Sequence, residues 1–185
     1  MLKRKTFFIK EKIMYEEIKQ RVEDNGWNLI HIGTNELLNK SEYSHGYWDN
    51  EPDFLDAFHR HMKIGADKTC ISIRFQVRRS SAFGYLCAYV KVNNLTPHIY
   101  DFDIYKSVPE FDSEENITCG IKYSPAFEIG IDGCHLWNKV PGREDHEEAA
   151  RYLSFLKCMR WQEDTEKQLL KFFESKSFDD IDNDT

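Results

Sequence analysis

The sequence predicts a single α+β domain whose sheet is mostly antiparallel. Apolar residues recur at helical spacing near both ends of the chain, whereas in the middle they alternate with polar residues. The alternating segments are joined by short runs of turn residues, as in an antiparallel meander. With 185 residues, of which 41% are hydrophobic, the chain is long enough to bury one core. We therefore expect one domain over residues 1–178, with N-terminal helices, a sheet, a long C-terminal helix and a disordered acidic tail over 179–185.

The first elements are predicted from apolar spacing and from a turn signal. A helix is expected over residues 10–24, where apolar residues at helical spacing are Ile13, Met14, Ile18 and Val22. Asn25-Gly26 supplies its C-terminal stop. Residues 27–32 then predict a short strand that Gly33-Thr34 ends, and residues 35–38 predict a further helical turn.

A second helix is predicted over residues 52–62. Pro52 suits a first helical turn and Gly65 suits the end. The apolar stripe of this helix would consist of Phe54, Leu55, Phe58 and Met62. On a helix, His59 and His61 would point to different faces, whereas two zinc ligands on a helix need i,i+4 spacing. We therefore expect no metal site at this pair.

The predicted sheet occupies the middle of the chain. Strands are expected over residues 70–77, 85–92 and 98–105, with one or two more over 117–123 and 127–131. Apolar positions at helical spacing then predict the long C-terminal helix over residues 144–174.

Charge and cysteine content narrow the class of protein. The net charge of −7 is interleaved, with 25 basic and 32 acidic residues, which disfavours a dedicated nucleic-acid binder without excluding one. No apolar run is long enough for a membrane span, and we expect a soluble cytoplasmic protein. The five cysteines include no Cys-x-x-Cys pair, so buried reduced thiols are expected rather than disulfides or a metal.

Carboxylates that share a strand face are candidates for catalysis. Glu128 and Asp132 lie on one face of the strand at 127–132, where they could be catalytic groups or solvated edge charges. Asp101 and Asp103 share a face in the same way. The four together could form a metal-dependent phosphodiesterase site, although an exposed polar face is the simpler explanation. The glycine-rich phosphate loops and the Gly-x-Ser-x-Gly elbow are absent.

Three short segments resemble the mono-ADP-ribosyltransferases of the cholera- and pertussis-toxin type. Residues 29–34, Leu-Ile-His-Ile-Gly-Thr, are similar to the first strand of that family, where an Arg or His contacts the ribose and phosphates of NAD. His31 takes that place, with Gly33 and Thr34 beside it. Ser72 matches the first serine of the second signature, whereas Ile73 and Arg74 depart from it.

The third segment runs from Ser124 to Ile131 and is similar to the family's late strand with its catalytic glutamate. The resemblance implies that Glu128 is catalytic and stabilises an oxocarbenium-like state as the nicotinamide–ribose bond breaks, without a metal. Ala126 stands where arginine-modifying members carry a Glu, so the acceptor should not be arginine. Tyr47 or Tyr123 would stack on nicotinamide.

The resemblance thus implies an NAD-dependent transferase that passes ADP-ribose to an unknown acceptor, such as a protein. Each signature residue also has a structural explanation: His31 as a core histidine, Ser72 as a strand serine and Tyr47-Trp48 as a packing anchor. The alternative function is a non-catalytic acidic interaction or inhibitor protein, which would use residues 110–116 and 43–48 to bind a basic partner.

Overall fold

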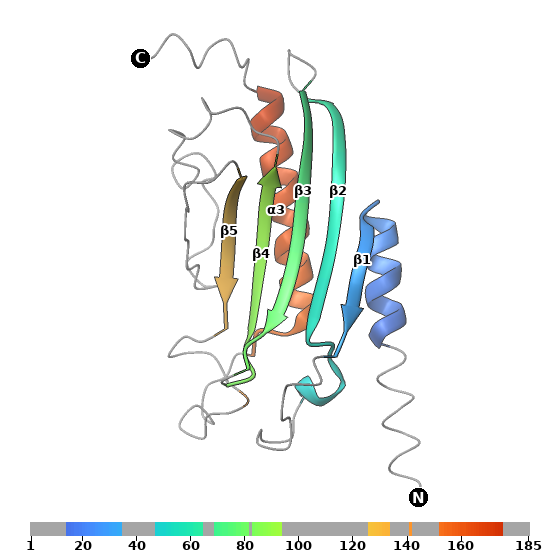
Figure 1. Cartoon of the computed structure of the whole chain (residues 1–185), viewed down its shortest axis with the longest axis vertical. Helices are drawn as coiled ribbons and strands as arrows, with labels where there is room; N and C mark the ends of the chain where they lie inside the picture. Colours follow the sequence, from blue (N-terminus) through green and yellow to red (C-terminus); the bar gives the residue numbers. More distant parts are fainter. Residues whose placement is uncertain are drawn as a thin grey trace, which may run out of the picture.

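The computed structural model describes residues 14–34, 47–64, 69–81, 83–93, 126–133, 141 and 152–175. Within these residues the chain forms a helix over residues 14–24, a five-stranded sheet and one long helix, α3 (Figure 1). The element bounds are η2 (Tyr47–Asn50), β1 (Asn28–Gly33), β2 (Phe54–Ile64), β3 (Thr69–Arg79), β4 (Leu86–Asn93), β5 (Ala126–Asp132) and α3 (Phe155–Ser175).

The five strands follow one another in the sheet in the order β1-β2-β3-β4-β5, and every neighbouring pair is antiparallel. The α+β class and the antiparallel sheet are therefore confirmed. The meander is tight between β3 and β4, where Gly84 adopts a positive φ of 74° within the turn. Among the described helices, none is long and apolar enough to cross a membrane.

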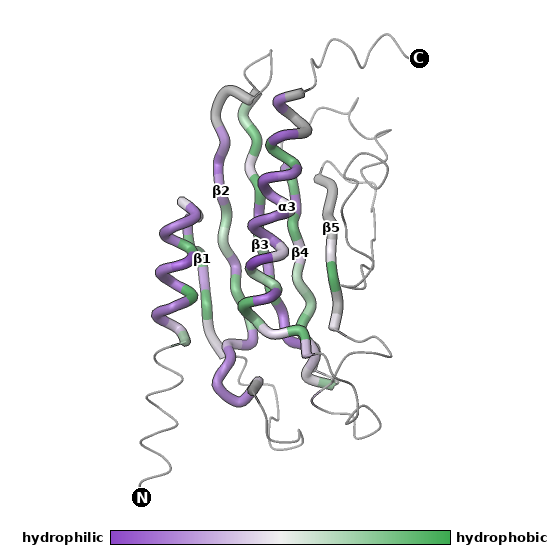
Figure 2. The backbone as a smooth tube through the Cα atoms, turned by 180° about the vertical axis from the view of Figure 1, so that it is seen from behind, coloured by the Kyte–Doolittle hydropathy of each residue, from purple (hydrophilic) through white to green (hydrophobic). Residues whose placement is uncertain are grey.

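Among the described elements, helix α3 covers one face of the sheet and none covers the opposite face, which we call the open face (Figures 1 and 2). Alternate residues of the strands point toward α3 and are buried, as the two-residue period of a strand requires. From the strands, the core receives Leu55, Ala57, Ile71, Ile73, Phe75, Val77, Leu86, Ala88, Val90, Val92 and Ile131. From α3 it receives Phe155, Cys158, Met159, Trp161 and Leu169. The helix over residues 14–24 adds Ile18 and Val22.

The helix predicted over residues 52–62 is wrong, because this segment is strand β2. Phe54, Phe58 and Met62 recur every four residues. This spacing puts residues on one face of a helix, but it is also twice the two-residue period of a strand and puts residues on one face of a strand as well. Leu55 and Ala57 are the buried face of the strand, and β2 gains a hydrogen-bonded partner on each side, β1 and β3. Tertiary pairing therefore decided between two structures that the local pattern allowed.

The C-terminal helix begins later than predicted. Residues 152–154 are not helical, and α3 starts at Phe155. The hydroxyl oxygen of Ser154 accepts a hydrogen bond from the backbone N–H of Lys157 at 3.3 Å, which is the contact of an N-cap residue. Residues 144–151 lie outside the described part of the chain, as do residues 35–38, 98–105 and 117–123.

Three of the cysteines can be placed. All three are free thiols, and Cys158 is buried as expected, whereas Cys87 is half-buried and Cys70 is exposed. The expectation of a buried thiol is therefore wrong for Cys70. Cys119 and Cys134 lie outside the described residues.

Candidate functional site

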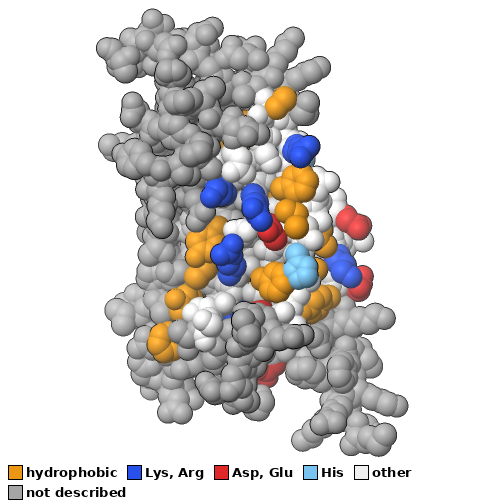
Figure 3. Space-filling view, viewed as in Figure 1, with side chains coloured by type: hydrophobic (Ala, Val, Ile, Leu, Met, Phe, Trp, Pro, Cys, Tyr) orange, Lys and Arg blue, Asp and Glu red, His pale blue; other side chains and the backbone are white. Residues whose placement is uncertain are grey.

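The face of the sheet opposite α3 carries polar, basic and aromatic side chains. Lys and Arg side chains gather on this open face, with hydrophobic side chains between them (Figure 3). The strand period assigns to this face four cations and one acid among the described residues of β2, β3 and β4: Arg60, Arg74, Arg78, Lys91 and Asp56. The whole chain has a net charge of −7, so this basic face contrasts with the net negative charge of the protein.

A hollow of about 470 Å³ opens on this face over strands β1, β2 and β3. It is lined by His31, Asp53, Phe54, Leu55, Asp56, Gln76, Arg78 and Arg79. The imidazole of His31 stacks on the ring of Phe54, with centroids 4.4 Å apart and planes at 16°. Gly33 lies beneath this stack, since a Cβ at Gly33 would lie 3.3 Å from Nε2 of His31 and 3.4 Å from Cζ of Phe54.

Asp56, which lines the hollow, is one partner of an ion pair with Arg74. Arg74 donates two hydrogen bonds to the carboxylate of Asp56, of which the bond from Nε to Oδ1 is 2.7 Å long. Burial disfavours the charged form of Asp56, but the hydrogen bonds and charge of Arg74 outweigh this, and the pKa of Asp56 is lowered. Asp56 therefore remains an acceptor at neutral pH, held by Arg74 in a fixed orientation.

Two arginines of the open face have no carboxylate of the described residues within ion-pair distance. Arg78 is exposed and donates a hydrogen bond of 3.0 Å to the side-chain oxygen of Gln76, which is neutral. Arg60 is exposed and lies over the ring of Phe58, 5.4 Å from its centroid. Of the two, only Arg78 lines the hollow.

Of the predicted NAD-binding residues, His31 and Ser72 are described with their side chains and lie on the open face, on β1 and β3. His31 is exposed and lines the hollow, and Thr34 is exposed directly after β1. Ser72 is half-buried and lies on β3 four residues from Gln76, which is about 13 Å along a strand. The hollow therefore contains His31 but not Ser72.

Glu128 belongs to the far edge of the sheet. Its backbone pairs with Lys91, and β5 is separated from β1 by the three strands β2, β3 and β4. Four strand spacings of about 4.8 Å put the two edge strands roughly 19 Å apart. The structure does not describe the side chains of Glu128 and Asp132. The segments that contain Asp101, Asp103 and Tyr123 are not described at all.

The loop predicted to provide a stacking aromatic is only partly described. Tyr47 is the first residue of η2, and its side chain is not described. Its neighbour Trp48 is buried and meets the ring of Tyr152 edge-on, with centroids 5.1 Å apart. Trp48 is therefore a packing residue, in agreement with the expectation that Tyr47-Trp48 anchors its loop by packing.

A second cluster lies on the opposite face of the sheet, under α3. Nδ1 of His59 and Nε2 of His61 each lie 2.8 Å from Oε1 of Glu166. The prediction that these histidines point to different faces is wrong, because β2 is a strand and residues two apart on a strand share a face. They continue the row of Leu55 and Ala57 beyond the apolar core. The His-x-His pattern is visible in the sequence, but it predicts two neighbouring imidazoles only if the segment is assigned as a strand.

Trp27 orients the carboxylate of this cluster. Its indole N–H donates to Oε2 of Glu166 at 2.7 Å, which turns Oε1 toward the two imidazoles. The indole ring is stacked on Phe75, with centroids 3.8 Å apart and planes at 12°. Trp27 comes directly after the turn at Gly26, whose φ of 68° is favourable only for glycine.

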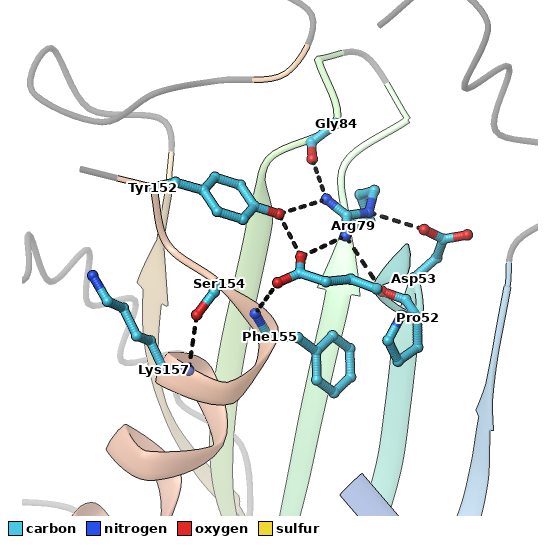
Figure 4. Close-up of polar contacts among 9 residues, drawn as sticks. Pro52, Asp53, Arg79, Gly84, Tyr152, Ser154, Phe155 and Lys157 are labelled. Carbon is cyan, nitrogen blue, oxygen red and sulfur yellow. Dashed lines mark hydrogen bonds and ion pairs between the residues drawn. The ribbon is translucent and has the colours of Figure 1, made fainter. Parts of the chain in front are cut away.

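A third polar group is a buried ion network around Arg79 (Figure 4). Nε of Arg79 donates to Oδ1 of Asp53 at 2.9 Å, and Nη2 donates to Oε2 of Glu51 at 3.0 Å. Nη1 donates to the carbonyl of Gly84 at 2.8 Å and to the hydroxyl of Tyr152 at 3.1 Å. The exposed fractions of the Arg79, Glu51 and Asp53 side chains are 1%, 3% and 0%.

This network connects the chain segments at one end of the sheet. Oε1 of Glu51 accepts the backbone N–H of Phe155 at 3.0 Å, so the carboxylate lies at the N-terminus of α3 (Figure 4). Burial lowers the pKa of Arg79, but the charges and hydrogen bonds of Tyr152 and Glu51 raise it by more. Every side chain is engaged by its neighbours, and we assign the network to stability rather than to ligand binding.

Comparisons of the chain with protein-family models, with curated proteins and with solved structures found no match.

Proposed function

We propose that the protein binds a nucleotide in the hollow on the open face of its sheet, and that NAD is the first ligand to test. The observation that carries this proposal is the combination, in one hollow, of the His31–Phe54 stack and the exposed guanidinium of Arg78. A nucleotide presents an aromatic ring and a phosphate, and these two groups need a flat ring surface and a cation.

The stacked rings suit a base or a nicotinamide ring. His31 is exposed and its ring plane is held parallel to Phe54 at 16°, so its outer face is available to a further ring. Gly33 beneath the stack leaves room for both rings. The resemblance to ADP-ribosyltransferases assigns His31 to the ribose and phosphates of NAD, which is the same ligand class.

The polar lining suits the remaining groups of a nucleotide. Arg78 has no carboxylate of the described chain as an ion-pair partner, and arginine binds phosphate through two parallel hydrogen bonds. Asp56 on β2 and Gln76, its pairing partner on β3, provide a carboxylate and an amide in the hollow, and both groups can bind ribose hydroxyls. Arg74 and Lys91 add positive charge nearby and would increase the association rate of an anion.

Isothermal titration of the full chain with NAD, AMP and nicotinamide tests this proposal. We expect NAD and AMP to bind with dissociation constants in about the micromolar to millimolar range, and nicotinamide to bind more weakly than either. No heat with NAD or AMP at millimolar concentration would overturn the proposal.

Two arginine variants distinguish binding in the hollow from non-specific attraction to the positive charge of the open face. Arg78→Gln should weaken AMP binding by about 10- to 100-fold, since a hydrogen bond between charged groups contributes about 1.5–3 kcal/mol. Arg60→Gln removes the same charge from the same face outside the hollow and should change binding by less than about threefold. Equal losses in the two variants would indicate non-specific attraction and would argue against a built site.

Transferase activity is a further step of this proposal, in which Glu128 acts on the nicotinamide–ribose bond. The strand order offers no support for a pocket shared by His31 and Glu128, since β1 and β5 are the first and last of the five described strands of the sheet. Mass spectrometry for released nicotinamide tests the step directly. Release that Glu128→Ala abolishes would support the transferase, whereas NAD binding without release would limit the function to binding.

A second candidate function is contact with another protein chain, which one observation favours on β1 rather than on residues 110–116 or 43–48. Leu29 and Ile30 are consecutive exposed apolar residues on the edge strand β1, at a bulge in its pairing with β2. A contact between two copies of the chain at this edge would make sedimentation concentration-dependent, and Ile30→Lys should abolish that dependence. A monomer at all concentrations would remove self-association through β1.

A further inference from the structure

We propose that His59, His61 and Glu166 form a binding site for a first-row divalent cation, with zinc as the reference ion. The three side chains come from β2 and α3, and their ligand atoms lie within 4.8 Å of one another. Two imidazole nitrogens and one carboxylate oxygen are the ligand set of the catalytic zinc sites that keep a fourth position open. The site lies on the α3 side of the sheet, so the proposal is independent of nucleotide binding on the open face.

The geometry requires only a small adjustment. In a tetrahedral site with bonds of about 2.0–2.1 Å, neighbouring ligand atoms are roughly 3.3 Å apart. Nδ1 of His59 and Nε2 of His61 are each 2.8 Å from Oε1 of Glu166, so these two distances need to open by about half an ångström. The imidazole rings already lie together, with centroids 4.0 Å apart.

The position of Glu166 favours a cation. Only 9% of its side chain is exposed, and buried carboxylates in proteins are paired with cations or coordinate metals. Among the described residues, the carboxylate of Glu166 is hydrogen-bonded to Trp27 and the two histidines and pairs with no Lys or Arg. The neighbouring acid Glu163 has its own bidentate partner, Arg21.

The residues around the three ligands hold them in place. Trp27 donates to Oε2 of Glu166 and is itself fixed by stacking on Phe75, so Oε1 is presented to the histidines. Such hydrogen bonds to a metal-binding carboxylate orient the ligand and raise affinity. On the other side of the cluster, Gly26 faces the ring of His59, where a Cβ would lie 3.6 Å from Nε2.

The exposure of the histidines leaves the site accessible. The exposed fractions are 27% for His59 and 15% for His61, against 9% for Glu166, so the cluster opens to solvent on its histidine side. A bound ion would therefore keep water or an exogenous ligand in its remaining position, as in catalytic rather than structural zinc sites.

Zinc and cobalt binding to the full chain, stripped with chelator, tests the proposal. We expect one zinc ion per chain by titration calorimetry, and cobalt should give the visible ligand-field bands of a low-symmetry four- or five-coordinate site. Zinc should displace the cobalt and remove these bands. A stoichiometry well below one, or cobalt bands typical of the hexahydrated ion, would overturn the proposal.

Variants locate the ion. His59→Ala and His61→Ala should each weaken zinc binding by 100-fold or more, and His31→Ala, a histidine on the open face, should leave it unchanged. Cys70→Ser controls for zinc binding by the exposed thiol and should also have no effect. Zinc bound equally well by both cluster variants would place the site elsewhere and refute the proposal.

Trp27→Phe distinguishes a metal site from a merely structural cluster. Phenylalanine retains a ring against Phe75 but removes the hydrogen bond to Glu166, and zinc affinity should fall by about 10- to 100-fold. If the histidine variants unfold, this variant still tests the site, provided that its urea unfolding midpoint shows a folded protein. An unchanged zinc affinity in folded Trp27→Phe would contradict the role of Glu166 as a ligand.

Discussion

The hydroxyl of Tyr152 donates a hydrogen bond of 2.5 Å to Oε2 of Glu51, and the two residues are 101 positions apart in the chain. The same carboxylate caps α3 through the backbone N–H of Phe155 and accepts from Arg79. One buried side chain thus connects the segment before β2, the end of β3 and the start of α3.

Arg79→Met should lower the free energy of unfolding by about 3–5 kcal/mol, because it leaves two buried carboxylates without their cation. Urea unfolding followed by circular dichroism measures the change. Arg78→Met, at the neighbouring exposed position, is the matched control and should stay within about 0.5 kcal/mol of the parent. A loss below about 1 kcal/mol for Arg79→Met would mean that the network contributes little.

Tyr152→Phe should destabilise the protein by about 1–3 kcal/mol near neutral pH, because Glu51 and Arg79 each lose a buried partner. Burial and the charge of Glu51 raise the pKa of Tyr152 well above its usual value. A group with a raised pKa contributes its full stability below its unfolded pKa, about 10 for tyrosine, and loses it as the pH rises further. The stability difference between the parent and Tyr152→Phe should therefore shrink above about pH 10, as urea titrations across that range would show. A constant difference would contradict the shift.

Asp56→Asn should remove an acid-dependent part of the stability. The pKa of Asp56 is lowered, with Arg74 outweighing the effect of burial, so its contribution is present above the unfolded pKa of about 3.9 and is lost as the pH falls through the folded pKa. The stability of the parent relative to Asp56→Asn should therefore decrease as the pH is lowered below about 4. Urea unfolding at a series of acidic pH values measures this, and parallel curves for the two proteins would be the contrary result.

Gly130→Ala should destabilise the protein by about 1–3 kcal/mol through overpacking. A Cβ at Gly130 would lie 2.8 Å from Cδ1 of Tyr89 and 3.3 Å from the carbonyl oxygen of Ala88, so the ring of Tyr89 has to move off β5. In a Tyr89→Ala background the same substitution should cost much less. A double-mutant cycle measures the coupling, and additive effects would show that Tyr89 is not the obstacle.

The candidate sites show which predictions local patterns can support. His31 was selected from its surrounding residues, and it does line a hollow of the open face, with Gly33 packed beneath it. A helix over residues 52–62 would separate His59 and His61, and only the strand β2 places them on one face. The partner Glu166 is 105 residues from His61, a separation at which no local pattern operates. The same is true of Glu51, whose contact with α3 has no signal in the sequence around either residue.

The sequence by itself determined the α+β class, the antiparallel strands of the middle region and the two amphipathic helices. These follow from the spacing of apolar residues, which differs between a helix and a strand and can be read from neighbouring positions. It also marked the glycine that ends the first helix, because the positive φ of Gly26 is a matter of local backbone chemistry. Only the tertiary structure decided that β2 is a strand, since four-residue spacing fits both periods and pairing with β1 and β3 chose between them. It alone also brought His59 and His61 to Glu166, and Arg79 to Glu51, because buried polar groups find partners across the folded chain rather than along it.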